Sequence, residues 1–388
     1  MSKSFVEKNK YAFGMFVFFV VMMALKMPPY NGMSSFSTTI YTATYDIGFS
    51  SRFLVGSVIF LFTDFLTLKA LYAIIIVSTL IMVALLSFML GYIPGRLDGA
   101  AGSGARAVML FYAAMPVSVI VLFKDMNFGR YDIYLIIVSM LILVCLSRRQ
   151  AAWLVPMLCG VCMLIHHVWM FSFMPAAAIL LIYTAGRGKK KGRGIAVCAL
   201  SFAVIIGLFI YFQFFKFDPG FATAEEMTAA MSKRVDYGLN SDIFYGEYFS
   251  SVQELWASYI KPILIEDSIP DALYLMPVFL PFLAVLYYVW FNAFLLCGEK
   301  FMRFVILLCM LSPASTLVQC VMINDYGRWF AAMLITQLSL MFFLAYKDEQ
   351  AVVGALEKLA GFFKGRPYLA VSAAAVIPIF TFSISYNL

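Results

Sequence analysis

The sequence predicts an all-α membrane protein with about 11 transmembrane helices, within a range of about 10–12. Of its 388 residues, 63% are hydrophobic and 13% are charged, whereas soluble globular domains average roughly 45–50% apolar and ~25% charged residues. The apolar residues form long continuous runs, which indicate helices and not the alternating strands of a membrane β-barrel. We therefore expect residues 1–388 to form a single transmembrane domain.

Basic residues set the expected orientation. The segment Gly186–Arg193 has five basic residues in eight positions, and Lys3, Lys8 and Lys10 precede the first apolar run. Because cytoplasmic loops are enriched in Lys and Arg, we place both regions, and hence the N-terminus, in the cytoplasm. The net charge of +7 is spread over loops and gives no support for nucleic-acid binding.

The first apolar run, residues 11–27, is expected to cross outward into a first external loop, residues 28–69. Within that loop the apolar stretch Phe53–Leu66 has fourteen residues, a helix of ~21 Å that is shorter than the ~30 Å hydrocarbon core. We expect this helix to lie along the outer surface of the membrane. The alternative, a short span, would reverse the facing of every loop up to residue 185 and turn 152–185 into one helix of ~50 Å, too long to cross unbroken.

Further apolar runs complete the predicted topology. Spans are expected at 71–93, 107–123, 133–146, 153–165, 169–183, 195–215, 273–296, 304–323, 330–345 and 368–384. Residues 96–106 read as a Gly-rich cytoplasmic loop, and residues 216–272 as a large external loop. Residues 347–366 predict a cytoplasmic amphipathic helix, because Val352, Leu356, Leu359 and Phe363 share one face.

With this topology the unusual polar residues fall on the outer side, where charged residues at a membrane edge commonly mark a substrate site. They are Asp46, Arg52, Lys124, Asp125, Arg130, Asp132, His166, His167, Asp325, Tyr326 and Arg328. Asp46 either caps the following helix, pairs with Arg52, or acts as a general base or metal ligand at the hydrocarbon edge.

Arginines on one side of a membrane suit either lipid headgroups or a bound phosphate, whose oxygens a guanidinium binds through paired hydrogen bonds. Arg52, Arg130 and Arg328, together with Lys124, are therefore candidate donor-phosphate ligands. Asp325 and Arg328 also have the spacing of an ordinary intrahelical pair.

His166 and His167 are the only histidines. Adjacent in a helix they would point ~100° apart, so we expect at most one of them to face a common site. Partners with zinc-ligand spacing are absent, and hydrogen bonding to a phosphate or sugar, or proton transfer, is the expected role. Asp125, Asp132, Asp325 and Tyr326 are candidates for binding an acceptor or a divalent cation, Mg²⁺ or Mn²⁺.

The sequence contains no P-loop, GxGxxG or GxSxG motif, so a cytoplasmic nucleotide is not expected as a direct substrate. The seven cysteines all lie in apolar segments, including Cys159 and Cys162 in a CxxC pattern, and are expected to pack as small apolar residues. No Asn-x-Ser/Thr acceptor occurs, which favours a bacterial source.

The layout resembles the GT-C superfamily of integral membrane glycosyltransferases. Members begin with a cytoplasmic N-terminus and one span, followed by an external loop with a catalytic acid and a surface helix; Asp46 and Phe53–Leu66 match that order. The chain departs from the family because Ile47, not an acid, follows Asp46, and because it lacks a large soluble C-terminal domain. Wzy-type polysaccharide polymerases have a similar size and a polar late loop.

The resemblance implies a sugar donor on a polyprenyl phosphate or diphosphate, with its lipid tail among membrane lipids, and a glycan or lipid acceptor on the outer face of a bacterial inner membrane. Asp46 would then deprotonate the acceptor, and Asp125 and Asp132 would lie in the second external loop of the family. The alternative function is a transporter or flippase of lipid-linked or small polar substrates. Transporters favour polar mid-span residues and broken helices, and the near absence of intramembrane charge favours the enzyme.

Overall fold

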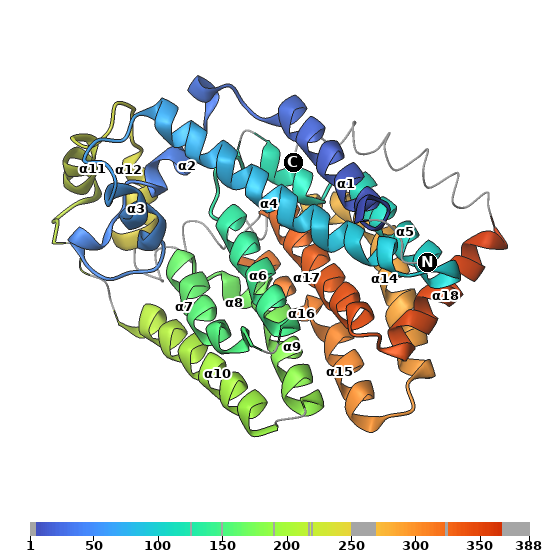
Figure 1. Ribbon diagram of the computed structural model, residues 1–388. Coiled ribbons are helices and arrows are strands. Elements are labelled where there is room, and N and C mark those ends of the chain that lie inside the picture. The colour runs from blue at the N-terminus through green and yellow to red at the C-terminus, as the bar shows by residue number, and fades with distance from the viewer. Residues whose placement is uncertain are drawn as a thin grey trace.

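The computed structural model describes residues 5–124, 126–148, 150–188, 191–215, 218, 220–249, 269–322 and 325–366. Regular structure in these ranges is helical, apart from one isolated bridge between Leu66 and Val235 (Figure 1). The all-α class predicted from composition is therefore confirmed.

The described helices include short 3₁₀ segments (η) and one π-helical turn (η5). In chain order they are α1 (Phe5–Lys26), η1 (Tyr30–Gly32), α2 (Ser35–Ile40), η2 (Tyr45–Ile47), α3 (Phe53–Phe60), α4 (Leu68–Arg96), α5 (Gly99–Ala114), η3 (Val119–Phe123), α6 (Asp132–Ser147), η4 (Ala152–Leu154), α7 (Val155–Ile165), α8 (Trp169–Ser172), α9 (Met174–Arg187), α10 (Lys191–Phe214), α11 (Ala224–Ser232), α12 (Ser241–Phe244), η5 (Tyr245–Phe249), α14 (Ile269–Leu296), α15 (Lys300–Leu311), α16 (Pro313–Met322), α17 (Tyr326–Tyr346) and α18 (Gln350–Lys364).

Seven helical stretches among the described residues are long and apolar enough to cross a membrane. They are Asn9–Lys26, Leu68–Arg96, Gly99–Phe123, Lys191–Phe214, Phe279–Leu296, Lys300–Cys320 and Tyr326–Tyr346. Three shorter apolar helices accompany them: Asp132–Ser147, Ala152–Ile165 and Met174–Arg187. The chain is thus a polytopic helical membrane protein; the predicted span 368–384 lies outside the described residues.

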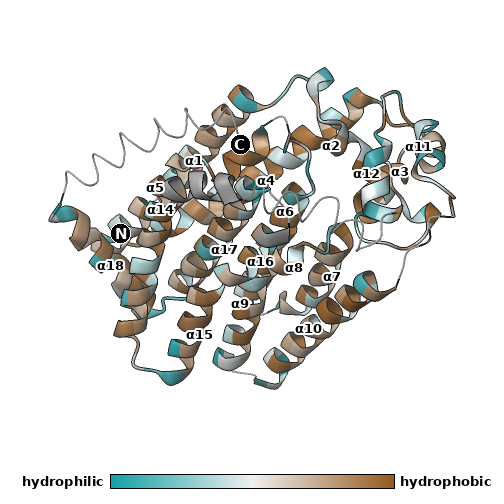
Figure 2. Cartoon of the chain, turned by 180° about the vertical axis from the view of Figure 1, so that it is seen from behind, coloured by the Kyte–Doolittle hydropathy of each residue, from teal (hydrophilic) through white to brown (hydrophobic). Residues whose placement is uncertain are grey.

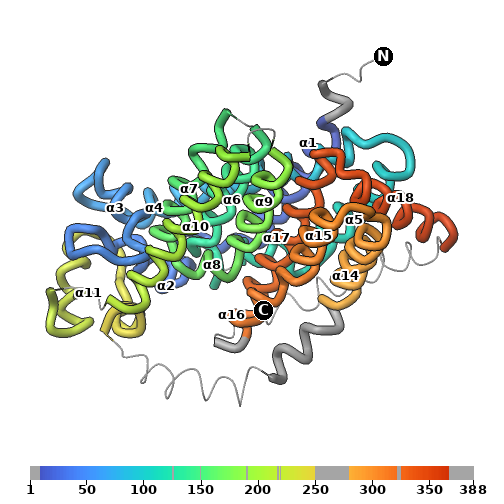
Figure 3. The backbone as a smooth tube through the Cα atoms, turned by 90° about the horizontal axis from the view of Figure 1, so that it is seen from below, coloured from blue at the N-terminus to red at the C-terminus, as the bar shows by residue number. Residues whose placement is uncertain are grey.

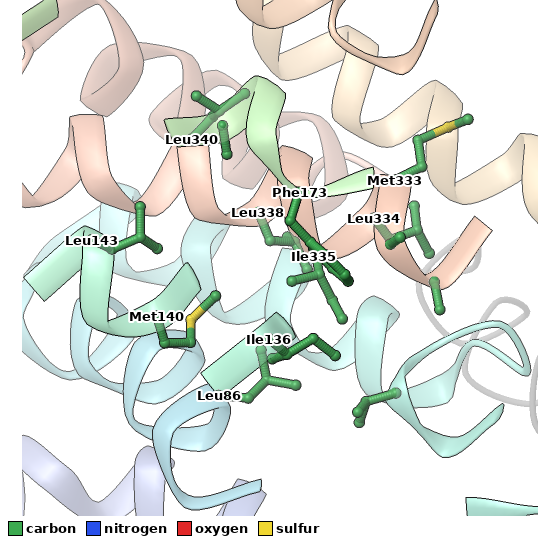
Figure 4. Packing of buried hydrophobic residues seen from close by; sticks show 14 of the residues in the cluster. Leu86, Ile136, Met140, Leu143, Phe173, Met333, Leu334, Ile335, Leu338 and Leu340 are labelled. Atoms are coloured by element: carbon green, nitrogen blue, oxygen red, sulfur yellow. The ribbon is translucent and has the colours of Figure 1, made fainter. Parts of the chain in front are cut away.

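Helix α17 is the centre of the bundle. Every residue from Tyr326 to Ala345 is buried, so this helix is apolar all round and packs on several neighbours. The core around it combines Leu86 of α4, Ile136 and Met140 of α6, and Ile335 and Leu338 of α17 (Figure 4). Figure 2 shows apolar residues along the helices and hydrophilic residues at the two ends of the bundle.

Helix α1 lies along α4, and a glycine permits their close approach. A Cβ on Gly91 of α4 would overlap the backbone of Ala12, whereas a Cβ on Gly14 of α1 would meet nothing within 4 Å. Small residues that let two backbones meet are typical of helix contacts in membranes.

The substitution Gly91→Ala is expected to destabilise the protein by about 1–3 kcal/mol, because the added methyl group must push α1 away from α4. Gly14→Ala is the matched control and is expected to be neutral or to stabilise by about 0.5–1 kcal/mol, since alanine is the better helix former. Thermal unfolding in detergent measures both. Equal unfolding temperatures for the two variants would contradict the close contact.

Two predicted boundaries are wrong. Residues 96–106 are not a loop: α4 continues to Arg96 and α5 begins at Gly99. The glycines of this segment serve packing, because a Cβ on Gly104 would overlap the carbonyl of Leu356 in α18. The run 107–123 is not one α-helix either. The helix ends before Met115, whose backbone is extended because a residue that precedes a proline disfavours the helical conformation. The chain becomes helical again in η3.

A cap is formed at one end of the bundle by residues 28–67 and 220–249, and α2, α3, α11 and α12 gather there in Figures 1 and 3. The cap has its own apolar cluster, made of Ala43, Phe53, Ala224, Met227, Met231 and Phe244. Backbone contacts join the two segments: the Leu66 N–H donates to the Arg234 carbonyl at 2.8 Å, and the Asn240 N–H to Thr39 Oγ1 at 3.0 Å. The sequence analysis treated them as parts of two separate loops, 28–69 and 216–272. Helix α14 begins at Ile269, before the predicted end of the second loop.

Helix α3 is shorter than the predicted Phe53–Leu66, because it ends at Phe60. Its eight residues give ~12 Å of helix, too little to cross a bilayer core of ~30 Å. Leu61 and Phe62, which follow it, are 78% and 85% exposed.

The basic loops meet at the end opposite the cap. Arg96 binds Asp348 at 3.1 Å, Arg187 binds Glu299 at 2.8 Å and Glu349 at 3.1 Å, and Lys347 donates to the Ser147 carbonyl at 2.9 Å. Helix α18 follows there, burying Val352, Ala355, Leu356 and Leu359 against α5 and α14.

Candidate functional site

The candidate site lies where the cap meets the bundle. Loops and helix ends from four parts of the chain contribute side chains: Arg52 from the cap, Arg130 and Asp132 at the start of α6, His166 and His167 between α7 and α8, and Asp325 and Arg328 at the start of α17. The sequence analysis expected all of these residues on the outer side of the membrane. The structure brings most of them into one charged cluster.

Arg328 is the most deeply buried charge of the cluster. Its Nε and Nη2 donate to Asp132 Oδ2 at 3.1 and 2.6 Å, and its Nη1 donates to Asp325 Oδ2 at 2.6 Å. The Arg328 and Asp132 side chains are only 5% and 4% exposed. The predicted intrahelical pair with Asp325 is therefore present, but the longer-range partner Asp132 ties α17 to α6. With two carboxylates bound, Arg328 holds the site together and has little capacity left for a substrate phosphate.

The positive charge of Arg130 is less well balanced by carboxylates than that of Arg328. Its Nη1 lies 4.0 Å from Asp325 Oδ2, its Nε donates to the Met126 carbonyl at 3.2 Å, and its guanidinium lies 3.8 Å above the ring centre of Phe36. Burial, with the neighbouring Arg328 charge, lowers the pKa of Arg130 from 12.5 to about 10. A shift in that direction indicates a cation that lacks full compensation by anions.

The two histidines lie outside a helix, whereas the sequence analysis assumed that they lie in one. Helix α7 ends at Ile165, and His166 is extended (φ −166°, ψ 117°) in the short link to α8. The His167 N–H donates to Ser51 Oγ at 3.0 Å, so the cap holds this break. Burial, and then the Arg52 charge, lower the pKa of both imidazoles, for His167 to about 3. Both rings are therefore neutral at pH 7, which suits hydrogen bonding better than proton uptake.

Arg52 points from the cap into this break. Its backbone is left-handed (φ 76°), uncommon for a residue other than glycine, and its N–H donates to the Leu164 carbonyl at 3.0 Å. The guanidinium lies with Nε 3.4 Å from His166 Nδ1 and Nη2 2.9 Å from His166 Nε2, and it forms an ion pair with Glu247 of η5. The side chain is 14% exposed.

Asp46 has different neighbours from those expected. Its carboxylate accepts from Arg234 Nη1 and from Thr44 Oγ1, each at 3.2 Å, and the side chain is 72% exposed. Asp46 thus pairs with Arg234 and not with Arg52, and the burial expected for a base at the hydrocarbon edge is not observed. Asp46 lies on the solvent side of the cap.

The remaining predicted residues are peripheral. Tyr326 donates its hydroxyl to the Cys320 carbonyl at 3.1 Å and stacks on Phe330. Burial and then the charge of Lys26 lower the pKa of Lys124 to about 8. Lys26 is the last residue of α1, so Lys124 lies near the end of that helix. Asp125 lies outside the described residues.

Two polar residues of the site were missed by sequence reasoning. Glu247 was one of several acids in a long polar loop, and nothing in its neighbours distinguished it. Ser51 contacts the chain on both sides of the histidine break. Its Oγ donates to the Met163 carbonyl at 3.4 Å and accepts from the His167 N–H at 3.0 Å. Only the packing of the cap on the bundle identifies either residue.

Arg328 binds both aspartates of the cluster. Asp132 and Asp325 each accept from it through Oδ2. Among the described residues no group of three or more His, Cys, Asp or Glu side chains could hold a metal ion. A separate apolar cavity of about 480 Å³ between α1 and α5, lined by Tyr11, Met15 and Met109 among others, contains none of the cluster residues.

Fold and site together define a polytopic helical membrane protein with a charged, largely buried cluster beneath a cap at one end. Comparison with family models, curated proteins and solved structures gave no match to this chain.

Proposed function

We propose that the protein is a membrane glycosyltransferase that transfers a sugar from a polyprenyl phosphate or diphosphate donor to a cell-surface glycan or lipid acceptor. The observation that carries the proposal is the convergence of Arg52, Arg130 and His166 from three separate parts of the chain at the junction of cap and bundle. Two guanidiniums and a neutral imidazole provide the fixed donors that a leaving phosphate needs.

The positive-inside rule supports an extracytoplasmic site in a bacterial inner membrane. Arg96, Arg187 and Lys347 share the end opposite the cap through their contacts with Asp348, Glu349 and the Ser147 carbonyl. Assigning that basic end and the N-terminus to the cytoplasm puts the cap outside. The exposed Leu61 and Phe62 after α3 suit the outer membrane interface, as the resemblance to the GT-C superfamily also implies.

Each residue then has a role. Arg52 and Arg130 bind the donor phosphate, and His166 accepts or donates one hydrogen bond beside it. Arg328, Asp132 and Asp325 are positioning residues that fix the ends of α6 and α17. Lys124 adds positive charge near the end of α1. Asp46, accessible to solvent beside Arg234, is the base that receives the proton of the acceptor hydroxyl.

Asp46→Asn tests the proposed base. We expect turnover by purified protein in nanodiscs with a polyprenyl-linked sugar donor to fall about 10²–10⁴-fold, because general base catalysis contributes about that much, with donor affinity retained. Asp64→Asn, an exposed acid of the same cap segment, is the matched control and should keep the wild-type rate. If Asp46→Asn turns over like the control, Asp46 is not the base.

Broken helices favour the transporter or flippase as the second candidate. The chain breaks between α7 and α8 and between α15 and α16. Gln319 Nε2, within α16, donates to the Val168 carbonyl at 3.2 Å and so joins α16 to the first break. Discontinuous helices are common at transporter binding sites. In proteoliposomes a flippase would move the lipid-linked sugar between leaflets without cleaving its glycosidic bond, whereas the proposed enzyme releases the polyprenyl phosphate or diphosphate.

A further inference from the structure

The cluster contains two ion pairs of different character. In the first, Arg328 makes three hydrogen bonds to two carboxylates, and all three residues belong to the starts of bundle helices. In the second, Arg52 has one carboxylate partner among the described residues, Glu247, which lies on a five-residue π-helical turn of the cap and is 25% exposed. Breaking the first pair would strand buried charges in the bundle, while the second can open toward solvent.

Arg52 nevertheless needs an anion. Its side chain is 14% exposed and its other described side-chain partner, His166, carries no negative charge. A guanidinium removed from water without a counter-charge costs several kcal/mol. In the structure Glu247 supplies that charge, at the position where the proposed function requires the donor phosphate.

A phosphate is the stronger ligand for this position. It offers several oxygens to the planar guanidinium and can form a bidentate contact with Arg52. The charge of Arg130, which acts on Arg52, attracts the same anion. Arg130 is available for this because its own contact, from Nη1 to Asp325 Oδ2, is 4.0 Å long.

We infer that the Glu247 carboxylate pairs with Arg52 where the donor phosphate would bind. A bound phosphate displaces Glu247 together with the turn Tyr245–Phe249. This inference rests on the proposed function and adds a residue to it: Glu247 sets the affinity of the donor site and couples donor binding to movement of the cap segment 241–249. The start of that segment is held in place by Phe244 in the apolar cluster of the cap, so the displacement is local.

The test is binding of inorganic pyrophosphate to the full chain in phosphatidylcholine nanodiscs, measured by calorimetry. We expect Glu247→Gln to bind at least about ten times more tightly than wild type, because the competing negative charge is gone. Glu226→Gln is the matched control: it removes the same charge from the same part of the cap, where Glu226 accepts from the Ala222 N–H, and it should bind like wild type.

Hydrogen–deuterium exchange of the wild-type chain gives a second readout that does not depend on a variant. Pyrophosphate should raise exchange of backbone amides in residues 241–249. Polyprenyl monophosphate in the nanodisc should do the same, and phosphatidylglycerol at equal amount should not. An equal response to phosphatidylglycerol would overturn the assignment of the occupant as the donor.

The failures are distinguishable. If wild type and Glu247→Gln bind pyrophosphate equally, or exchange of 241–249 does not change on binding, the displacement is refuted and the donor site of the proposed function stands. If neither protein binds pyrophosphate or polyprenyl phosphate, the donor site and the displacement are both refuted.

Discussion

Replacing Arg328 with methionine is expected to lower the free energy of unfolding by about 3–5 kcal/mol, which is typical when one partner of a buried ion pair is removed. The variant leaves the Asp132 carboxylate, 4% exposed, without its cation, and it also releases Asp325. Thermal unfolding in detergent, and urea unfolding where it is reversible, measure the loss.

Arg193→Met is the matched control, because Arg193 is exposed and, among the described residues, donates one long hydrogen bond of 3.5 Å to the Gln150 carbonyl; we expect a change within about 0.5 kcal/mol. The double variant Asp132→Asn with Arg328→Met should recover part of the loss, since the stranded charge is removed with its partner. If Arg328→Met unfolds like Arg193→Met, Arg328 does not organise the site.

Replacing Arg52 has the largest expected effect on activity. Arg52→Ala removes the proposed phosphate ligand at the histidine break and should reduce kcat/KM by at least about 10³-fold, because a charge-assisted paired contact to the leaving phosphate is lost. Arg52→Lys keeps the charge but not the planar fork, so we expect a loss of about 10–100-fold. Initial rates with a polyprenyl-linked donor, at equal amounts of folded protein, measure both.

Arg96→Lys provides the control, since Arg96 pairs with the exposed Asp348 at the opposite end, and it should keep the wild-type rate. Arg52→Lys with full activity would exclude paired recognition of the phosphate by Arg52. Full activity of Arg52→Ala would remove Arg52 from the site altogether.

Hydropathy predicted the class of the fold because continuous apolar runs must bury their backbone polar groups in helices within lipid. Described helices overlap all the predicted spans except 368–384, which the structure does not describe. Boundaries were less accurate where packing decided them. Gly104 reads as a loop residue, yet it lies within α5 because the backbone of Leu356 approaches it closely. The histidines lie outside a helix because Ser51 and Arg52 of the cap bind the backbone of the break.

The candidate site was partly predictable. Grouping polar residues on one predicted side of the membrane selected Arg52, Arg130, Asp132, His166 and Arg328, which the structure brings together. The same argument could not distinguish Arg328, which two carboxylates bind, from Arg52, whose described carboxylate partner is partly exposed. It also placed Asp46 next to Arg52, because the two are close in sequence, whereas the carboxylate binds Arg234.

The composition and spacing of single segments were enough to predict that the chain is helical and belongs in a membrane, and to select polar residues of which the packing brings several together. The charge pairs could not be predicted in this way: Arg328 with Asp132, Arg52 with Glu247, and Asp46 with Arg234. Each of these pairs joins residues far apart in the chain. A buried guanidinium needs a carboxylate beside it, and the packing of the cap on the bundle determines which carboxylate that is. The spacing of residues along the sequence does not contain this information.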